Sequence, residues 1–247
     1  MLSKLGFTVL AVIGLFIFLW VTQPAYAVPA LQLFIADGFY NLADETWETG
    51  SPDFTLTAFA LDKGDFGPNG GKDAFGNGTN DAILSLALSS DTFPQSTPPP
   101  INSVTINGSA IPTSSWTWGY APISNDPGVF DGGNDDLPKH GIFPAWYTEY
   151  AFNFGSVQED IVFDTQPDEN GDLDMTHLLD GWQFDFDIHI SDSLDRVHFD
   201  LYTLGTDGTI YENAPFSHDA AFVPEPATLT LMGSGLLGML LMRRRRG

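Results

Sequence analysis

The sequence of 247 residues contains no cysteine. This absence excludes a disulfide framework, a thiol nucleophile and any thiolate metal site. In an oxidising compartment this protein would therefore form no disulfide bond.

Basic residues are almost as scarce in the central part of the chain. Residues 28–224 keep 31 of the 32 acidic residues but four of the nine Lys and Arg residues, which leaves a net charge of −27. This balance excludes binding to nucleic acid or to an anionic membrane surface through a basic patch. Cations, basic surfaces and neutral glycans remain as partners, and solubility alone is the alternative reason for the charge. Because 13% of the residues are aromatic, the chain is not an acidic disordered one.

Long apolar runs occur only at the two ends. At the N-terminus, Lys4 precedes an apolar run over residues 5–21, and Ala25-Tyr26-Ala27 has the small-x-small pattern of a cleavage site. This plan predicts a secretory signal peptide over residues 1–27, cleaved by signal peptidase after Ala27. A retained anchor helix is the alternative, since the run approaches the length that spans a bilayer.

The C-terminus has three consecutive parts. Pro224, Glu225 and Pro226 precede the uncharged segment 227–242, which is followed by Arg243, Arg244, Arg245 and Arg246. The positive-inside rule predicts a transmembrane helix with the arginines in the cytoplasm and the rest of the chain outside. The two prolines keep Glu225 in an extended segment next to the membrane.

This end resembles the PEP-CTERM sorting signal of Gram-negative bacteria. The resemblance implies recognition by an exosortase-type membrane enzyme, an inner-membrane intermediate, and delivery to the cell surface or to an extracellular matrix that contains exopolysaccharide. An unprocessed tail anchor is the alternative. We therefore divide the chain into the signal peptide (1–27), an extracellular domain (28–222) and a sorting signal (223–247).

Alternation of apolar and polar residues dominates the central region. In residues 182–190, Trp182, Phe184 and Phe186 alternate with Gln183 and Asp185, which indicates a half-buried strand. Further strands are expected at 31–35, 54–61, 82–88, 103–106, 148–154 and 197–202. Asn107-Gly108 is typical of a tight turn with positive φ angles. The pattern predicts an all-β fold, a single β-sandwich of jelly-roll or immunoglobulin-like type. The Pro-rich segment 96–100 is expected to be an interstrand loop, with a linker between two subdomains as the alternative.

Several short segments share a second resemblance. They are residues 28–33, Tyr40, 45–47, 137–144, 199–202 and 214–220. Together they resemble the choice-of-anchor N family, whose members carry one extracellular domain with different C-terminal anchors. The resemblance implies no known activity.

The best candidate for a ligand site is the acidic segment 164–174. Asp168, Asn170, Asp172 and Asp174 are spaced two residues apart, and oxygen ligands of this kind suit calcium. The match to an EF-hand loop is imperfect, because Gly171 comes too early and no Glu closes the loop. A solvated acidic turn is the alternative. The acidic loop 131–136 and Asp62, Asp65, Asp73 and Asp81 are weaker candidates.

Other chemistry has less support in the sequence. His189 and His198 are expected on the exposed faces of neighbouring strands, where they could approach each other, while His140 and His218 are expected to make structural hydrogen bonds. Trp116 and Trp118, with Tyr120, are either a sugar-stacking platform or, as we prefer, core residues. No nucleophile elbow, phosphate-binding loop or dinucleotide fingerprint is present, so no catalytic residue is predicted.

These observations lead to one expectation and two alternatives. We expect a non-enzymatic structural or interaction protein of the surface or matrix. A calcium-stabilised carbohydrate-binding module is the second hypothesis, and a hydrolase is the third.

Overall fold

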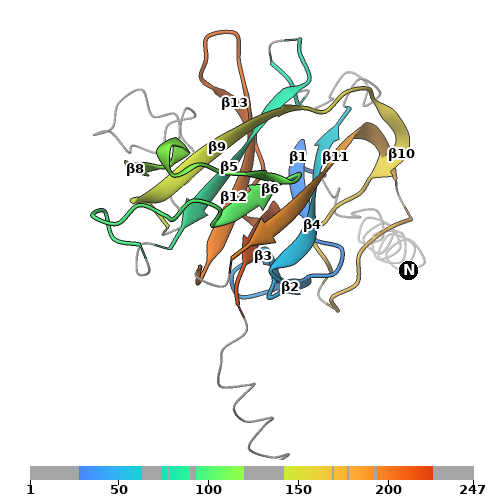
Figure 1. Ribbon diagram of the computed structural model, residues 1–247. Coiled ribbons are helices and arrows are strands. Elements are labelled where there is room, and N and C mark those ends of the chain that lie inside the picture. The colour runs from blue at the N-terminus through green and yellow to red at the C-terminus, as the bar shows by residue number, and fades with distance from the viewer. Residues whose placement is uncertain are drawn as a thin grey trace, which may run out of the picture.

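The computed structural model describes residues 28–62, 74–76, 78–89, 93–119, 142–168, 170–176, 178–191 and 194–224 (Figure 1). The predicted signal peptide, with Ala25 and Ala27, and the predicted transmembrane segment 227–242 lie outside these residues. Within the described part of the chain, no helix has the length and apolar character needed to cross a membrane.

The described residues form an all-β fold of two sheets. Sheet A contains β1 (Leu31–Phe34), β4 (Asp53–Leu61), β6 (Val104–Ile106), β7 (Ser109–Ala110), β10 (Gln158–Val162) and β11 (Leu179–Ile190). Sheet B contains β2 (Phe39–Asn41), β3 (Thr46–Thr49), β5 (Asp81–Leu88), β8 (Thr117–Gly119), β9 (Ala145–Asn153), β12 (Val197–Leu204), β13 (Ile210–Asn213) and β14 (Asp219–Phe222). Two short 3-10 helices are η3 (Thr113–Ser115) and η4 (Phe216–His218).

The long strand β11 organises sheet A. The order is β1-β4-β11-β6-β7, and β10 also pairs with β11. β4 runs along one edge of β11 from Gly181 to His189. The other edge of β11 is shared, because β10 pairs near Gly181 and β6 pairs near Ile188. A strand of this length therefore holds two short strands end to end.

Strand β12 has the same role in sheet B. The order is β2-β3-β14-β12-β5-β9-β8, and β13 also pairs with β12. One edge of β12 pairs with β5, and the other edge pairs with β14 near Val197 and with β13 near Tyr202. β14 runs parallel to β3, whereas the other described pairings are antiparallel.

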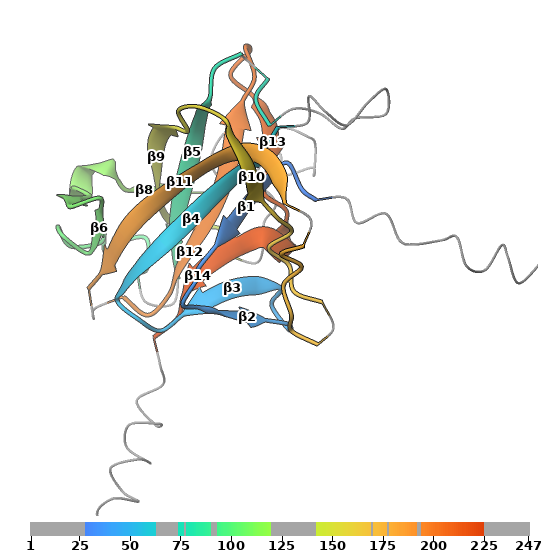
Figure 2. The ribbon, with the colours of Figure 1, turned by 90° about the vertical axis from the view of Figure 1, so that its right-hand side faces the viewer.

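The two sheets pack face to face around one core (Figure 2). Apolar residues at alternate positions of both sheets supply it, among them Leu56 and Phe186 from sheet A and Leu84 and Phe199 from sheet B. The ring of Phe186 lies 4.8 Å from the ring of Phe152 across the gap. Alternation along each strand thus directs one set of side chains into a sandwich core.

The predicted strands are confirmed, with ends that differ by a few residues. The turn prediction is also confirmed: Asn107 and Gly108 join β6 to β7 with φ angles of 50° and 74°. The Pro-rich segment 96–100 lies between β5 of sheet B and β6 of sheet A.

Two expectations about the histidines were wrong. His189 and His198 are not on neighbouring strands, because β11 belongs to sheet A and β12 to sheet B. His198 is buried rather than exposed. On the same outer face of sheet B, Tyr202 packs in a second apolar cluster with Phe143 and Ile210. This cover means that both faces of β12 are buried.

The inter-sheet aromatic packing gives a first prediction. Replacing Phe186 by Ala leaves a cavity between Phe152, Phe184 and Tyr150, so we expect a loss of about 3–5 kcal/mol in the free energy of unfolding. Urea unfolding followed by tryptophan fluorescence measures it. Val157→Ala is the control, because Val157 is exposed and should change stability by less than about 0.5 kcal/mol. Equal effects of the two substitutions would contradict the packing described.

Candidate functional site

The outer face of sheet B holds a buried cluster of two carboxylates and an imidazole. Residues His198 and Asp200 are two positions apart on β12, so both project away from the sandwich core, while Asp219 begins the adjacent strand β14. The Nε2 atom of His198 lies 3.2 Å from Oδ1 of Asp200 and 3.8 Å from Oδ2 of Asp219. The three residues are 4%, 2% and 0% exposed.

Burial controls the charge state of this cluster. It raises the pKa of the Asp219 carboxyl well above its usual range, and the negative charge of Asp200 acts in the same direction. Among the described residues, this is the one group in which ligand atoms of three His, Asp or Glu side chains all lie within 4.8 Å of one another. Such a group can share a proton or hold a cation.

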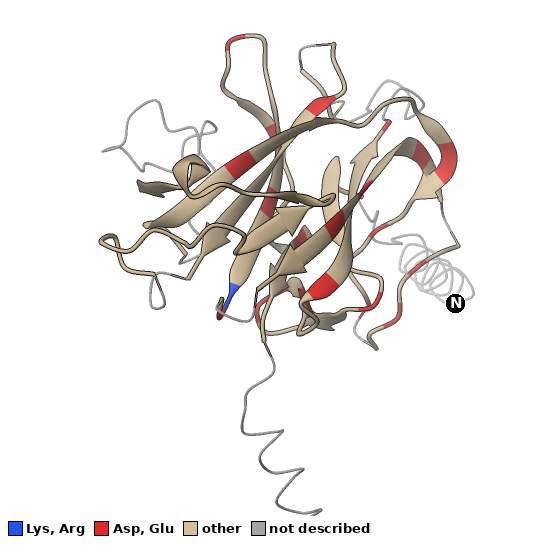
Figure 3. Ribbon diagram, in the orientation of Figure 1, with Lys and Arg blue, Asp and Glu red and all other residues tan. Residues whose placement is uncertain are grey.

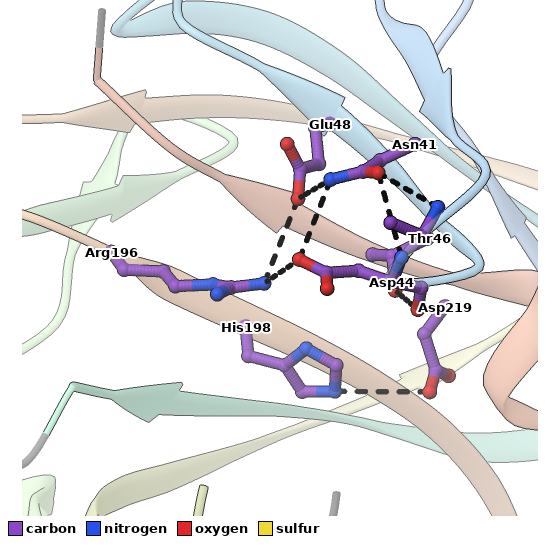
Figure 4. Close-up of polar contacts among 8 residues, drawn as sticks. Asn41, Asp44, Thr46, Glu48, Arg196, His198 and Asp219 are labelled. Atoms are coloured by element: carbon purple, nitrogen blue, oxygen red, sulfur yellow. Dashed lines mark hydrogen bonds and ion pairs between the residues drawn. The ribbon is translucent and has the colours of Figure 1, made fainter. Parts of the chain in front are cut away.

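A second polar network lies beside the cluster (Figure 4). Arg196 Nη2 lies 3.5 Å from Oδ2 of Asp44 and 3.6 Å from Oε1 of Glu48. Asn41 donates to the same Glu48 oxygen at 3.2 Å. Arg196 is the one Lys or Arg in the described part of the chain, where acidic positions are spread over both sheets (Figure 3). Its guanidinium therefore compensates the buried Glu48 carboxylate.

A separate hydrogen-bonded series includes His218. Oγ of Ser217 lies 2.7 Å from Nδ1 of His218, and Nε2 of His218 lies 2.8 Å from Oδ1 of Asp164. These residue types also form the serine-hydrolase triad, but there the hydroxyl faces Nε2 and the carboxylate faces Nδ1. The order is reversed here and His218 is buried. These contacts link the segment after β10 to the start of β14, so His218 has the structural role that the sequence predicted.

Strand β2 joins this series through Tyr40. Its hydroxyl donates to the backbone oxygen of Ser217 at 3.0 Å. Burial raises the pKa of Tyr40 to about 12, and the charges of Glu45, Asp164 and Asp219 act in the same direction, while a hydrogen bond with Gln166 opposes them.

The predicted calcium loop is held by its own backbone. The Asp168 carboxylate accepts hydrogen bonds from the amides of Asp172 and Asn170 and from the Asn170 side chain, which hold its pKa below the usual range. The Asp174 carboxylate accepts the amide of Thr176. Asp168, Asp172 and Asp174 do not form a three-ligand group among the described residues. Calcium binding at this loop stays a prediction.

The remaining sequence candidates are dispersed. Nδ1 of the exposed His189 lies 2.7 Å from Oδ1 of Asp53. Trp116 is buried in the core, as preferred, and the half-buried Trp118 packs against Trp146 at 5.9 Å. The candidates that lie outside the described residues are Asp65, Asp73, Tyr120, 131–136 and His140.

A shallow groove runs along the edge strand β2 and was missed in the sequence. It encloses about 260 Å³ and is lined by Gly38, Phe39, Tyr40, Leu42, Trp47, Pro167 and Gly171. Phe39 and Leu42 are 58% and 65% exposed. Trp47 donates its indole N–H to the Thr165 oxygen at 2.8 Å, which holds the acidic loop beside β3. No local pattern marks the groove, because two distant segments form it.

The chain leaves the domain from an interior strand. β14 lies between β3 and β12, and the Val223 amide donates to the Thr49 oxygen at 2.9 Å. Pro224 is the last described residue, so Glu225, Pro226 and Arg243 to Arg246 lie outside. The three-part C-terminal segment therefore follows the folded domain almost directly.

Comparison with known proteins identifies this segment. The family model for the PEP-CTERM protein-sorting motif matches residues 222–246, beginning at the last residue of β14. The motif implies export and membrane-linked processing by an exosortase. No curated protein and no solved structure matches the chain. The resemblance of residues 28–221 to the choice-of-anchor N family stays a prediction.

The environment of Tyr40 predicts a pH dependence. Because its pKa is raised from 10.0 to about 12, the folded protein keeps a proton that the unfolded chain releases. This contribution to stability is complete below pH 10 and is lost as the pH rises toward 12. We expect urea midpoints to fall less steeply between pH 9.5 and 11.5 in Tyr40→Phe than in the wild type. Parallel curves would show that Tyr40 titrates normally.

Proposed function

We propose that this chain is a non-enzymatic structural or interaction protein of the cell surface or extracellular matrix, sorted there by an exosortase. Its displayed part is the acidic β-sandwich, of jelly-roll or immunoglobulin-like type and related to the choice-of-anchor N family. The observation that carries the proposal is the sorting-motif match at residues 222–246.

The geometry of the exit strand supports this role. β14 is paired on both edges, and Val223 continues that pairing to Thr49. Cleavage near the motif would therefore leave the sandwich intact, because the strand pairings of the described residues all lie on the domain side of Glu225. The folded domain would also stand close to the membrane before it is released.

The charge of the domain supports a position outside the cell. Exposed carboxylates such as Asp185 and Asp187 lie on the outer face of β11, and residues 28–224 carry a net charge of −27. Like charges keep neighbouring copies hydrated and apart, and they attract cations. Such a surface suits a hydrated matrix of neutral or cation-linked polysaccharide.

Processing of the two ends is the direct test. In protein recovered from the native host, we expect an intact mass for a chain that starts at Val28 and lacks residues 227–247. Glu225→Ala should keep its tail and stay in the inner membrane, because the residue between the two prolines is changed. Extra mass on the processed wild type would identify a new anchor.

A matched substitution controls this test. Glu159 is an exposed glutamate on β10, so Glu159→Ala should leave the processing unchanged. A wild-type chain that still carries Arg243 to Arg246 would contradict sorting and would indicate a tail anchor.

The groove along β2 favours carbohydrate binding as a second candidate function. It combines the exposed ring of Phe39 with Tyr40 and Trp47, and it lies beside the acidic loop proposed for calcium. Aromatic faces stack on the apolar faces of sugar rings, and carboxylate and amide oxygens accept hydrogen bonds from the sugar hydroxyl groups. This placement replaces the Trp116 platform, because Trp116 is buried.

Binding to exopolysaccharide purified from the host tests this second function. Phe39→Ala should weaken binding about tenfold, as expected when about 1.4 kcal/mol of contact is lost. Met175→Ala removes an exposed apolar side chain outside the groove and should have no effect. Removal of calcium should weaken binding only if the acidic loop holds the ion. Equal binding by Phe39→Ala and wild type would exclude the groove.

A further inference from the structure

The buried cluster of His198, Asp200 and Asp219 lies on the outer face of sheet B and includes no residue of the sorting motif or of the groove lining. Its histidine and first aspartate alternate with the core residues Val197 and Phe199 along β12. The antiparallel register pairs His198 with Ala221 and Phe199 with Ala220, so the next step places Asp219 across from Asp200. Three side chains from two adjacent strands thus converge on one point.

The distances within the cluster suit a metal ion. Zinc binds nitrogen and oxygen ligands at about 2.0–2.2 Å, so two ligands of a tetrahedral site lie about 3.3–3.6 Å apart. His198 Nε2 lies 3.2 Å from one aspartate oxygen and 3.8 Å from the other. The three ligand atoms all lie within 4.8 Å of one another, so they can be arranged around one central ion by movements of their side chains.

The charge of the cluster also suits a cation. Two carboxylates are taken out of water here, which is costly unless positive charge or protons compensate them. A divalent cation bound by both carboxylates would supply such positive charge.

A second, independent observation comes from strand β5. Ser85 lies directly opposite Asp200 in the β5–β12 register, so its side chain projects from the same face. Ser85 is 0% exposed, and its Oγ atom has no hydrogen-bond partner. Buried hydroxyl groups are rarely left in this state, so a ligand of the site, or water bound to it, is expected next to Asp200.

We propose that His198 Nε2 and one carboxylate oxygen each from Asp200 and Asp219 bind a divalent transition-metal ion of the zinc class. The imidazole nitrogen favours zinc over calcium and magnesium, which select oxygen ligands. Because the cluster is buried, the ion has a structural role: it ties β14 to β12 immediately before the chain leaves the domain. The site differs in residues and in strand from the acidic loop proposed for calcium.

Metal titration of the full-length protein in detergent tests the proposal. After removal of metals by EDTA, we expect one equivalent of zinc to bind per chain, measured by calorimetry and by native mass spectrometry. Zinc at 100 times its dissociation constant should raise the unfolding midpoint by about 5–10 °C, because it binds only the folded state. Cobalt in its place should give the visible absorption of a tetrahedral site.

Matched substitutions assign the site. His198→Gln and Asp219→Asn preserve side-chain shape and should each weaken zinc binding at least 100-fold. Asp187→Asn, on the exposed face of β11, should bind zinc as the wild type does. If either cluster variant fails to fold, the cobalt spectrum of the wild-type protein still decides, because one imidazole and oxygen ligands give a spectrum distinct from that of an all-oxygen site.

Two results would overturn the proposal. The first is binding of less than about a tenth of an equivalent of zinc by the wild-type protein, which would mean that protons or a cationic side chain compensate the cluster. The second is zinc binding by His198→Gln and Asp219→Asn as tight as that of the wild type, which would place the ion elsewhere. Loss of binding in Asp168→Asn with no loss in the cluster variants would assign it to the acidic loop.

Discussion

The burial of both faces of strand β12 is the constraint on which the rest of this structure depends. Its inner side chains, including Phe199, pack in the core between the sheets, and its outer side chains His198, Asp200 and Tyr202 are also removed from solvent. Both of its edges are paired as well, with β5 on one side and β14 and β13 on the other. A strand enclosed in this way fixes the positions of the side chains that pack against it from the neighbouring strands.

This enclosure separates the two outer faces of the sandwich in chemical terms. On sheet A the outer carboxylates of β11, such as Asp187, remain in water, where their charge costs little. On sheet B the carboxylates of Asp200 and Asp219 are buried, and this burial raises the pKa of Asp219. Aspartate therefore contributes to solubility on the outer face of sheet A, whereas on the outer face of sheet B it is a candidate metal ligand.

The last strand, β14, connects the folded domain to the C-terminal sorting motif. Because β14 is held between β3 and β12, the sorting signal emerges from a fixed point of the sandwich. The cluster at the start of β14 and the signal at its end are separated by one short strand, Asp219–Phe222. Any contact that stabilises the β14–β12 pairing therefore also stabilises the strand from which the sorting-motif segment begins.

The sequence alone determined the sorting signal and the inward and outward sides of the strands. Both are local properties: the Pro224–Arg246 pattern is linear, and the alternation from Trp182 to Ile190 follows from the two-residue repeat of a strand. Only the tertiary structure decided which strands are neighbours, because any alternating strand can pair with any other through the same backbone groups. The tertiary structure therefore places His189 and His198 in different sheets and brings Asp219 next to His198 and Asp200. It also buries Trp116 and forms the β2 groove from segments about 130 residues apart.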